Sequence, residues 1–331
     1  MKKNVFIGID VSKEKLDIYI YGFNYHFIVS NDTKGLVKLL ETSCEITECK
    51  SSNFFICFEN TGKYSKMLSV FLHTQEITFI MEPALRIKKS LGMARGKNDK
   101  VDSKRIALYV YEKRESLEPT ILPGEKVEKI KSLLSLREKL IKHRTAYKNG
   151  ISDLNDCYQE GETKLIKDVQ QRLIVNINQE IKKIENEINC IIESDLKMQN
   201  NFNLITTITG IGKINAYFLI AYTANFTLFK NARAFACYCG IAPFDNSSGK
   251  YSGNTKVHHF ANKQLKTLLN MAATSAIKTN GELKEYYNKR VLVLGKNKRS
   301  TINIIRNKIV YRVFAVVSRG TPYVNLYKFA A

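Results

Sequence analysis

Three β-rich runs lie within the first 30 residues of the chain, and only a few polar residues separate them. The runs cover residues 5–9, 16–21 and 25–30. Connections this short join antiparallel neighbours, because a parallel crossover needs a dozen or more residues. We therefore expect the chain to begin with an antiparallel meander.

Helices and strands alternate after the meander. Asn31-Asp32-Thr33 is typical of a helix cap, and the helix that it starts is predicted to run to Leu40. The remaining expectations for this part are strands at 53–58 and 77–81 and helices at 64–72 and 101–113. This order predicts an α/β N-terminal domain, residues 1–124, with a mixed sheet and helices outside it.

The remaining two thirds of the chain have helical periodicity. Residues 125–200 form the second predicted domain, in which Ile174, Ile177, Ile181, Ile184, Ile188 and Ile191 are spaced as in a coiled-coil seam. Two antiparallel helices, a dimerisation stalk and an ordinary amphipathic helix all fit this seam. Residues 201–331 are predicted to be a mostly α-helical, basic C-terminal domain with a last helix near 301–318.

Positive charge is concentrated near the C-terminus. The chain carries 52 Lys+Arg and 31 Asp+Glu, a formal net charge of +21, and the segment from Lys250 onward holds 16 basic and two acidic residues. Codon bias toward lysine does not by itself produce this distribution. A polyanionic partner, and nucleic acid in particular, explains it better.

Four acidic residues stand where a metal-dependent phosphoryl-transfer site requires them. Asp10 ends the first strand, Glu59 ends the fourth strand, and Asp99 and Asp102 lie on one face at the start of a later helix. If the first and fourth strands are parallel neighbours, Asp10 and Glu59 emerge at the same sheet edge. Carboxylate oxygens are the ligands that Mg²⁺ prefers, and paired ions can clamp attacking and leaving oxygens. Taken one at a time, each acid is more simply a turn or cap residue.

Four stretches of the sequence together resemble the DEDD transposases of bacterial insertion sequences, which include Piv-type DNA invertases and bridge-RNA-guided recombinases. They are Phe6-Ile7-Gly8-Ile9-Asp10-Val11-Ser12-Lys13-Glu14-Lys15-Leu16-Asp17, Cys57-Phe58-Glu59-Asn60-Thr61-Gly62-Lys63-Tyr64, Lys97-Asn98-Asp99-Lys100-Val101-Asp102-Ser103-Lys104-Arg105-Ile106-Ala107, and Phe235-Ala236-Cys237-Tyr238-Cys239-Gly240-Ile241-Ala242-Pro243 followed by Ser247-Ser248-Gly249. The similarity spans essentially the whole chain.

The resemblance implies an RNase H-like (RuvC-like) N-terminal domain in which Asp10, Glu59, Asp99 and Asp102 bind Mg²⁺. It also implies that Ser248 attacks a DNA phosphate and forms a transient covalent link, with Ser247 and Ser252 as alternatives. Because the acids and the serine lie in different domains, they must meet through folding or across an oligomer. A structured noncoding guide RNA and a homo-oligomer, dimer or tetramer, are implied partners.

Two further groups of residues are candidates for backbone contacts with nucleic acid. Gly210, Gly212 and Lys213 fit a helix-hairpin-helix turn, although a plain interhelical turn fits equally well. Arg306, Lys308 and Arg312 flank the apolar stripe of the last helix, where a solvated face is the usual interpretation.

The sequence as a whole thus predicts a cytoplasmic bacterial DNA transposase that moves its own insertion sequence. No run is long enough for a membrane span. A site-specific DNA invertase and a RuvC-like junction-resolving nuclease remain open, as does a non-catalytic nucleic-acid-binding scaffold.

Overall fold

The computed structural model describes residues 4–90, 98–157, 163–248, 251–257, 261–279 and 281–324, with side chains omitted at 157, 245–248 and 251–256. The chain forms two compact units, Met1–Leu122 and Pro123–Ala331. Each unit is described by itself below.

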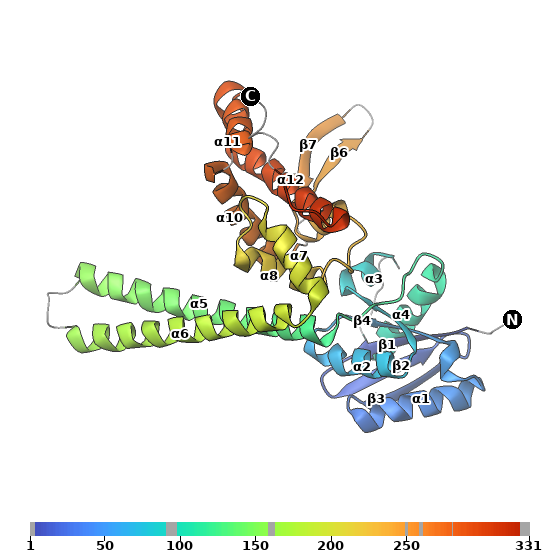
Figure 1. The fold of residues 1–331 in the computed structure, drawn as a ribbon. Helices are drawn as coiled ribbons and strands as arrows, with labels where there is room; N and C mark the ends of the chain where they lie inside the picture. The colour runs from blue at the N-terminus through green and yellow to red at the C-terminus, as the bar shows by residue number, and fades with distance from the viewer. Residues whose placement is uncertain are drawn as a thin grey trace. The chain divides into compact units, whose positions relative to one another are not determined.

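Unit 1 is built on a five-stranded mixed sheet with the order β3-β2-β1-β4-β5 (Figure 1). The strands are β1 Val5–Val11, β2 Lys15–Ile20, β3 Tyr25–Ser30, β4 Phe54–Glu59 and β5 Thr78–Glu82. The first three form the expected antiparallel meander, and β4 and β5 run parallel to β1. All five predicted strands are therefore present, each within two residues of its expected limits.

Helices cover both faces of this sheet. α1 Thr33–Thr47 and α2 Lys63–Thr74 share a core with Ile7, Ile9 and Ile56, whereas α3 Ala84–Ser90 and α4 Asp99–Lys113 pack with Cys57 and Ile80 on the other face. Asp32 caps α1 by accepting from Gly35 N–H at 2.8 Å, as its position predicts. α1 runs seven residues past Leu40, and α3 was not expected from the sequence.

Gly8 allows α4 to approach β1 unusually closely. A Cβ atom at this position would lie 2.2 Å from the backbone nitrogen of Ala107 and 2.4 Å from the carbonyl oxygen of Ser103. Both atoms belong to the α4 backbone, which has no flexible side-chain end to move away. A side chain at residue 8 is therefore excluded by the present position of α4.

Unit 2 begins with two long helices, α5 Glu125–Cys157 and α6 Lys164–Glu193 (Figure 1). Lys129 pairs with Glu187 and Arg137 with Glu185, both at 2.7 Å, so the helices run antiparallel. Five of the six seam isoleucines are buried, and Ile177 is partly so. The chain therefore forms an antiparallel helix pair, one of the arrangements that the seam allowed; a supercoiled coiled coil and a dimerisation stalk stay predictions.

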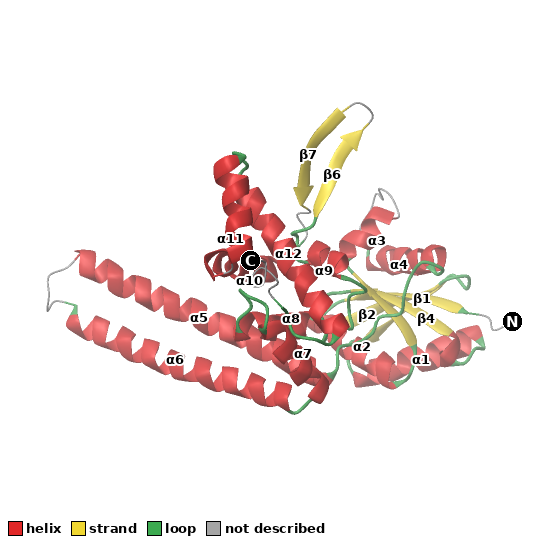
Figure 2. Cartoon of the chain, turned by 45° about the horizontal axis from the view of Figure 1, so that its top comes forward, coloured by secondary structure: helices red, strands yellow, loops and turns green. Residues whose placement is uncertain are grey.

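The rest of unit 2 is mostly helical, as expected. The helices are α7 Leu196–Thr206, α8 Lys213–Tyr222, α9 Ala232–Tyr238, α10 Lys263–Thr279, α11 Gly281–Asn288 and α12 Lys298–Arg319, with a π-helical turn at Lys289–Val293. α8 is buried along most of its length, and Ile305, Ile309 and Val313 of α12 join the same core. The hairpin of β6 Pro243–Ser248 and β7 Tyr251–Val257 projects from the helices and was not predicted (Figure 2).

The described part of the chain contains no helix that is long and apolar enough to cross a membrane.

The Gly8 contact gives a test of how unit 1 is assembled. Gly8→Ala should destabilise the α4–β1 contact by about 1–3 kcal/mol, because the added methyl group forces backbone atoms apart. Hydrogen–deuterium exchange of the β1 and α4 amides should accelerate accordingly. Gly124→Ala is the control, since nothing lies within 4 Å of a Cβ there. Unchanged exchange in Gly8→Ala would contradict the close packing.

Candidate active site

The strand ends beside α4 carry a cluster of acidic side chains. Side chains alternate between the two faces of a strand, and Ile7 and Ile9 of β1 face α1 and α2. Asp10 therefore projects from the face that α4 covers. By the same alternation Glu59, which follows Ile56 and Phe58 of the α1 face, also projects toward α4.

The register of the sheet brings these two acids together. β1 and β4 are parallel neighbours, with Ile9 opposite Phe58, so Asp10 and Glu59 follow at the same edge. The condition under which the sequence placed Asp10 and Glu59 at one sheet edge is therefore met. Asp99 and Asp102 lie in the first turn of α4, where Asn98 caps the helix by accepting from Lys100 N–H. The Gly8 contact sets how closely α4 lies over the strands that carry Asp10 and Glu59.

Electrostatics show that the four acids interact. Burial, and then the charges of Glu59, Asp99, Asp102 and Asp17, raise the pKa of Asp10 to about 6. The pKa of Glu59 is raised mainly by burial, with Lys88 opposing and Asp102 adding to the shift. Like charges in a partly buried place disfavour ionisation of each other, and a bound cation relieves that repulsion.

Two more acids share this edge and were not predicted from the sequence. Asp17 lies directly opposite Asp10 in the antiparallel β1–β2 pair, and Glu82 lies opposite Glu59 in β5. Both are buried, with 3% and 5% of their surface exposed. Each has a basic partner: His26 Nε2 lies 3.1 Å from Asp17 Oδ1, and Arg86 Nη1 lies 2.9 Å from Glu82 Oε1. The available signal for Glu82 was its place directly after the predicted strand 77–81, as Asp10 and Glu59 directly follow the predicted strands 5–9 and 53–58.

Lys15 connects the sheet to α4 through two carboxylates. Its Nζ atom lies 2.7 Å from Asp99 Oδ2 and 3.0 Å from Asp17 Oδ2. The hydrogen bonds to Asp99 and Asp17 raise the pKa of Lys15 above its usual value. An ammonium group thus sits beside one of the four predicted acids and neutralises part of the cluster's charge.

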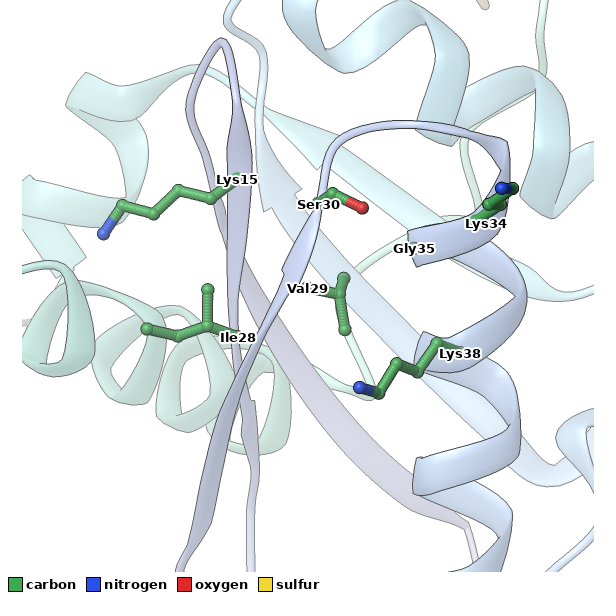
Figure 3. A pocket seen from close by; sticks show the side chains of 7 residues that line it. All are labelled: Lys15, Ile28, Val29, Ser30, Lys34, Gly35 and Lys38. Atoms are coloured by element: carbon green, nitrogen blue, oxygen red, sulfur yellow. The ribbon is translucent and has the colours of Figure 1, made fainter.

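The same lysine borders a basic hollow of about 330 Å³ at the outer edge of the sheet (Figure 3). Lys34 and Lys38 of α1 line it together with Ser30 of β3. Figure 3 shows the Lys15 ammonium directed away from Ser30 and α1, while Lys38 extends toward Val29. The hollow is therefore a separate, cation-lined surface rather than the acid cluster itself.

The carboxylates of Asp10, Glu59, Asp99 and Asp102 are chemically suited to a hard divalent cation, but in the described part of the chain they are not arranged as a complete metal site. Carboxylate oxygens are the ligands that Mg²⁺ and Ca²⁺ prefer. One of them, on Asp99, already contacts a positive charge, the ammonium group of Lys15. Among the residues that the structure describes, however, no three acidic, histidine or cysteine side chains are placed to hold one ion.

Ser248 is the last residue of β6, opposite Tyr251 of β7, and Ser247 lies opposite Ser252. The side chains of all three serines, and Gly249 and Lys250, lie outside the described residues. The backbone thus places Ser248 at the C-terminal end of β6, in the last described pair of the hairpin.

The predicted nucleic-acid-binding residues all lie in unit 2. Gly210 has a positive φ of 95°, and a Cβ there would lie 2.5 Å from the carbonyl oxygen of Ala272, so this glycine also serves packing on α10. Gly212 is the N-cap of α8, and the first residue of that helix, Lys213, is exposed.

The three cations of α12 that were predicted to contact nucleic acid have intramolecular partners. Arg306 Nη2 donates to Asn270 Oδ1 at 2.7 Å, and Arg312 Nη2 contacts both carboxylate oxygens of Glu282 at 2.8 Å. Lys308 Nζ lies 4.5 Å from the ring centre of Tyr286. Burial lowers the pKa of Arg306. Contact of these side chains with nucleic acid stays a prediction.

Two family models match the chain. One, described as a transposase of the DEDD type, matches residues 7–157 and so includes all four predicted acids. The other is described as the Transposase IS116/IS110/IS902 family and matches residues 202–288, which include Ser248.

Relatives of known description agree with these matches. The pilin gene-inverting proteins of Moraxella bovis and Moraxella lacunata are each 25% identical over 329 residues, covering 96% of this chain and 97% of theirs. An uncharacterized 44.8 kDa protein of insertion element IS116 from Streptomyces clavuligerus is 27% identical, covering 39% of this chain and 31% of its own.

The raised pKa of Asp10 predicts a pH-dependent stability. Folding raises this pKa from about 3.8 to about 6, so between these values the folded chain holds a proton that the unfolded chain releases. The free energy of unfolding should fall as pH rises through this window. Asp10→Asn removes the effect. In buffer without divalent cations, the melting temperature of this variant minus that of wild type should therefore be larger at pH 7 than at pH 4.

Asp32→Asn is the matched control for this measurement. The backbone N–H of Gly35 lowers the pKa of Asp32, so its carboxyl group stays ionised across the window. The melting temperature of this variant relative to wild type should therefore not rise between pH 4 and pH 7. Equal behaviour of the two variants would refute the acid cluster as the cause.

Proposed function

Because this chain belongs to the DEDD transposase family of insertion elements, it is a DNA-recombining enzyme, and we propose that it acts through a metal-bound acid tetrad and a covalent serine–DNA intermediate. The observation that carries the proposal is the position of Asp10, which shares the α4 face and an electrostatic environment with Glu59, Asp99 and Asp102. The function proposed first is excision and insertion of the element that encodes the chain.

The acid residues have a defined role in this proposal. Asp10, Glu59, Asp99 and Asp102 would hold divalent cations, with Mg²⁺ the expected ion, which supply charge neutralisation and Lewis acidity at a DNA phosphate. Lys15 would keep Asp99 and buried Asp17 oriented through its two short contacts. Asp17 and Glu82 are buried and paired with His26 and Arg86, so they would support the tetrad rather than bind the ion.

The proposed nucleophile is the Ser248 hydroxyl. Attack of Oγ on a backbone phosphorus forms an Oγ–P ester and breaks one P–O bond of the strand. The serine hydroxyl loses its proton and the oxygen of the released strand end takes one up, so charge is balanced. One phosphodiester bond is exchanged for another, so the strand can be rejoined without an external energy source. The partner strand end reverses the step and frees the serine. The position of Ser248 at the C-terminal end of β6 in a projecting hairpin supports this role.

The proposed partners are the ends of the element, a target DNA, and a structured noncoding RNA that selects both DNAs by base pairing. The protein would act as a dimer or tetramer in the cytoplasm. Inversion of a DNA segment is the second candidate function. It is favoured by the similarity to pilin gene-inverting proteins along nearly the whole chain.

Recombination between a donor and a target plasmid tests the proposal. Asp10→Asn and Ser248→Ala should each lower product formation by at least about a thousand-fold, since the first removes a proposed metal ligand and the second removes the proposed covalent nucleophile. Denaturing gels should show a protein–DNA adduct with wild type and none with Ser248→Ala. Ser247→Ala is the matched control and should keep both product and adduct.

Two results would contradict this mechanism. Mg²⁺-dependent cleavage that persists in Ser248→Ala indicates a nuclease that uses water as nucleophile. Recombination at wild-type rate in both Asp10→Asn and Ser248→Ala would show that neither group takes part in the chemistry. A non-catalytic scaffold would instead show no Mg²⁺-dependent strand cleavage, and its DNA binding would be unchanged by Asp102→Asn. A donor with inverted sites distinguishes inversion from transposition by product size.

The RNA partner has a separate test. The chain expressed with its native flanking DNA should co-purify with one structured RNA encoded in that DNA, identified by sequencing. Recovery of only bulk cellular RNA would argue against a dedicated guide.

A further inference from the structure

The turn between α11 and α12 exposes three consecutive apolar side chains. Leu292, Val293 and Leu294 are 73%, 77% and 51% exposed, and we call them the apolar tip. Large apolar side chains are usually scattered singly over a surface. Three in succession at the end of a turn mark a surface that gains stability when a partner covers it.

The backbone of this turn is well held. Leu294 N–H donates to the carbonyl of Lys289 at 3.0 Å, and Lys296 N–H donates to the carbonyl of Arg290 at 2.9 Å. Asn297 then caps α12 by accepting from Arg299 and Ser300 N–H. The apolar tip is therefore presented on an ordered turn and not on a loose loop.

Exposed cations flank the apolar tip along the chain. Lys289, Lys296, Lys298 and Arg299, here called the basic collar, are all exposed. The sequence contains no Asp or Glu after Glu285. A second copy of the same turn would meet like charge, so the favoured partner is a polyanion that also offers apolar surface.

Duplex DNA has both properties. Its phosphates attract Lys and Arg, and its stacked bases accept apolar side chains that wedge between base steps and kink the helix. We propose that the apolar tip inserts into duplex DNA at a flexible base step while the basic collar holds the flanking phosphates. This inference rests on the proposed function, because it assigns DNA as the partner of unit 2, but it needs no acid tetrad and no serine chemistry.

Binding of the full chain to a 30-base-pair duplex with 2-aminopurine beside TA steps tests the proposal, since these steps unstack readily. EDTA in the buffer prevents metal-dependent cleavage, so the result does not depend on recombinase activity. Wild type should raise the 2-aminopurine fluorescence. The triple variant Leu292→Ser, Val293→Ser, Leu294→Ser should abolish the rise and weaken binding about tenfold, or ~1.4 kcal/mol, at an unchanged salt slope.

A charge variant and an apolar control complete the design. Lys296→Gln, Lys298→Gln, Arg299→Gln should lower the slope of log K against log salt by about 0.9 for each phosphate that the variant no longer neutralises. Leu196→Ser removes a leucine that is 78% exposed at the start of α7 and should change neither fluorescence nor affinity. All three variants alter exposed side chains, so their melting temperatures should equal that of wild type.

The proposal fails if the triple serine variant unstacks and binds the duplex as wild type does. It also fails if that variant instead loses binding to vesicles of anionic phospholipid, or only to an RNA hairpin, because the apolar tip then serves a membrane or an RNA surface. An unchanged salt slope in the charge variant would exclude the basic collar as the group that holds the phosphates.

Discussion

The contact between α4 and β1 at Gly8 is the constraint on which the candidate site depends. The helix approaches the strand so closely that no side chain fits between them, and this distance determines how far Asp99 and Asp102 lie from Asp10. Parallel pairing of β1 with β4 then places Glu59 at the same edge. Two local features, a glycine and a strand register, thus assemble acids that are up to 92 positions apart, from 10 to 102.

Bringing these acids together costs stability, and the structure offsets only part of that cost. Asp17 and Glu82 are buried but paired with His26 and Arg86, and Lys15 bridges Asp17 and Asp99. Asp10 keeps a raised pKa, because the described charges that act on it are carboxylates and add to the effect of its burial. A group kept unfavourable in the folded chain is typical of a functional site, where the compensating charge comes from outside the protein.

Strand-end positions made most of this site predictable from sequence. The short spacing of the first three strands predicted the meander. Asp10 and Glu59 were singled out because they directly follow the predicted strands 5–9 and 53–58, although β1 itself runs one residue past Asp10. Lys15, Asp17 and His26 were not predictable as a group, because their contacts depend on the register of two hairpins. β6 and β7 were missed because Asn246, Ser247 and Ser248 lack the alternating apolar pattern of a half-buried strand. α3 is only seven residues long, too short for a periodic signal.

The excess of positive charge indicated a polyanion but did not locate its binding surface. Arg306 and Arg312 contribute to the formal charge, yet their guanidinium groups contact Asn270 and Glu282 within unit 2. Such contacts stabilise helix packing, and they reduce the interaction that these guanidinium groups can make with a polyanionic partner. Exposed cations are a better guide, and four of them, Lys289, Lys296, Lys298 and Arg299, lie close in sequence to the exposed apolar tip. Net charge therefore identifies the class of partner, whereas burial and pairing of each cation identify the place of contact.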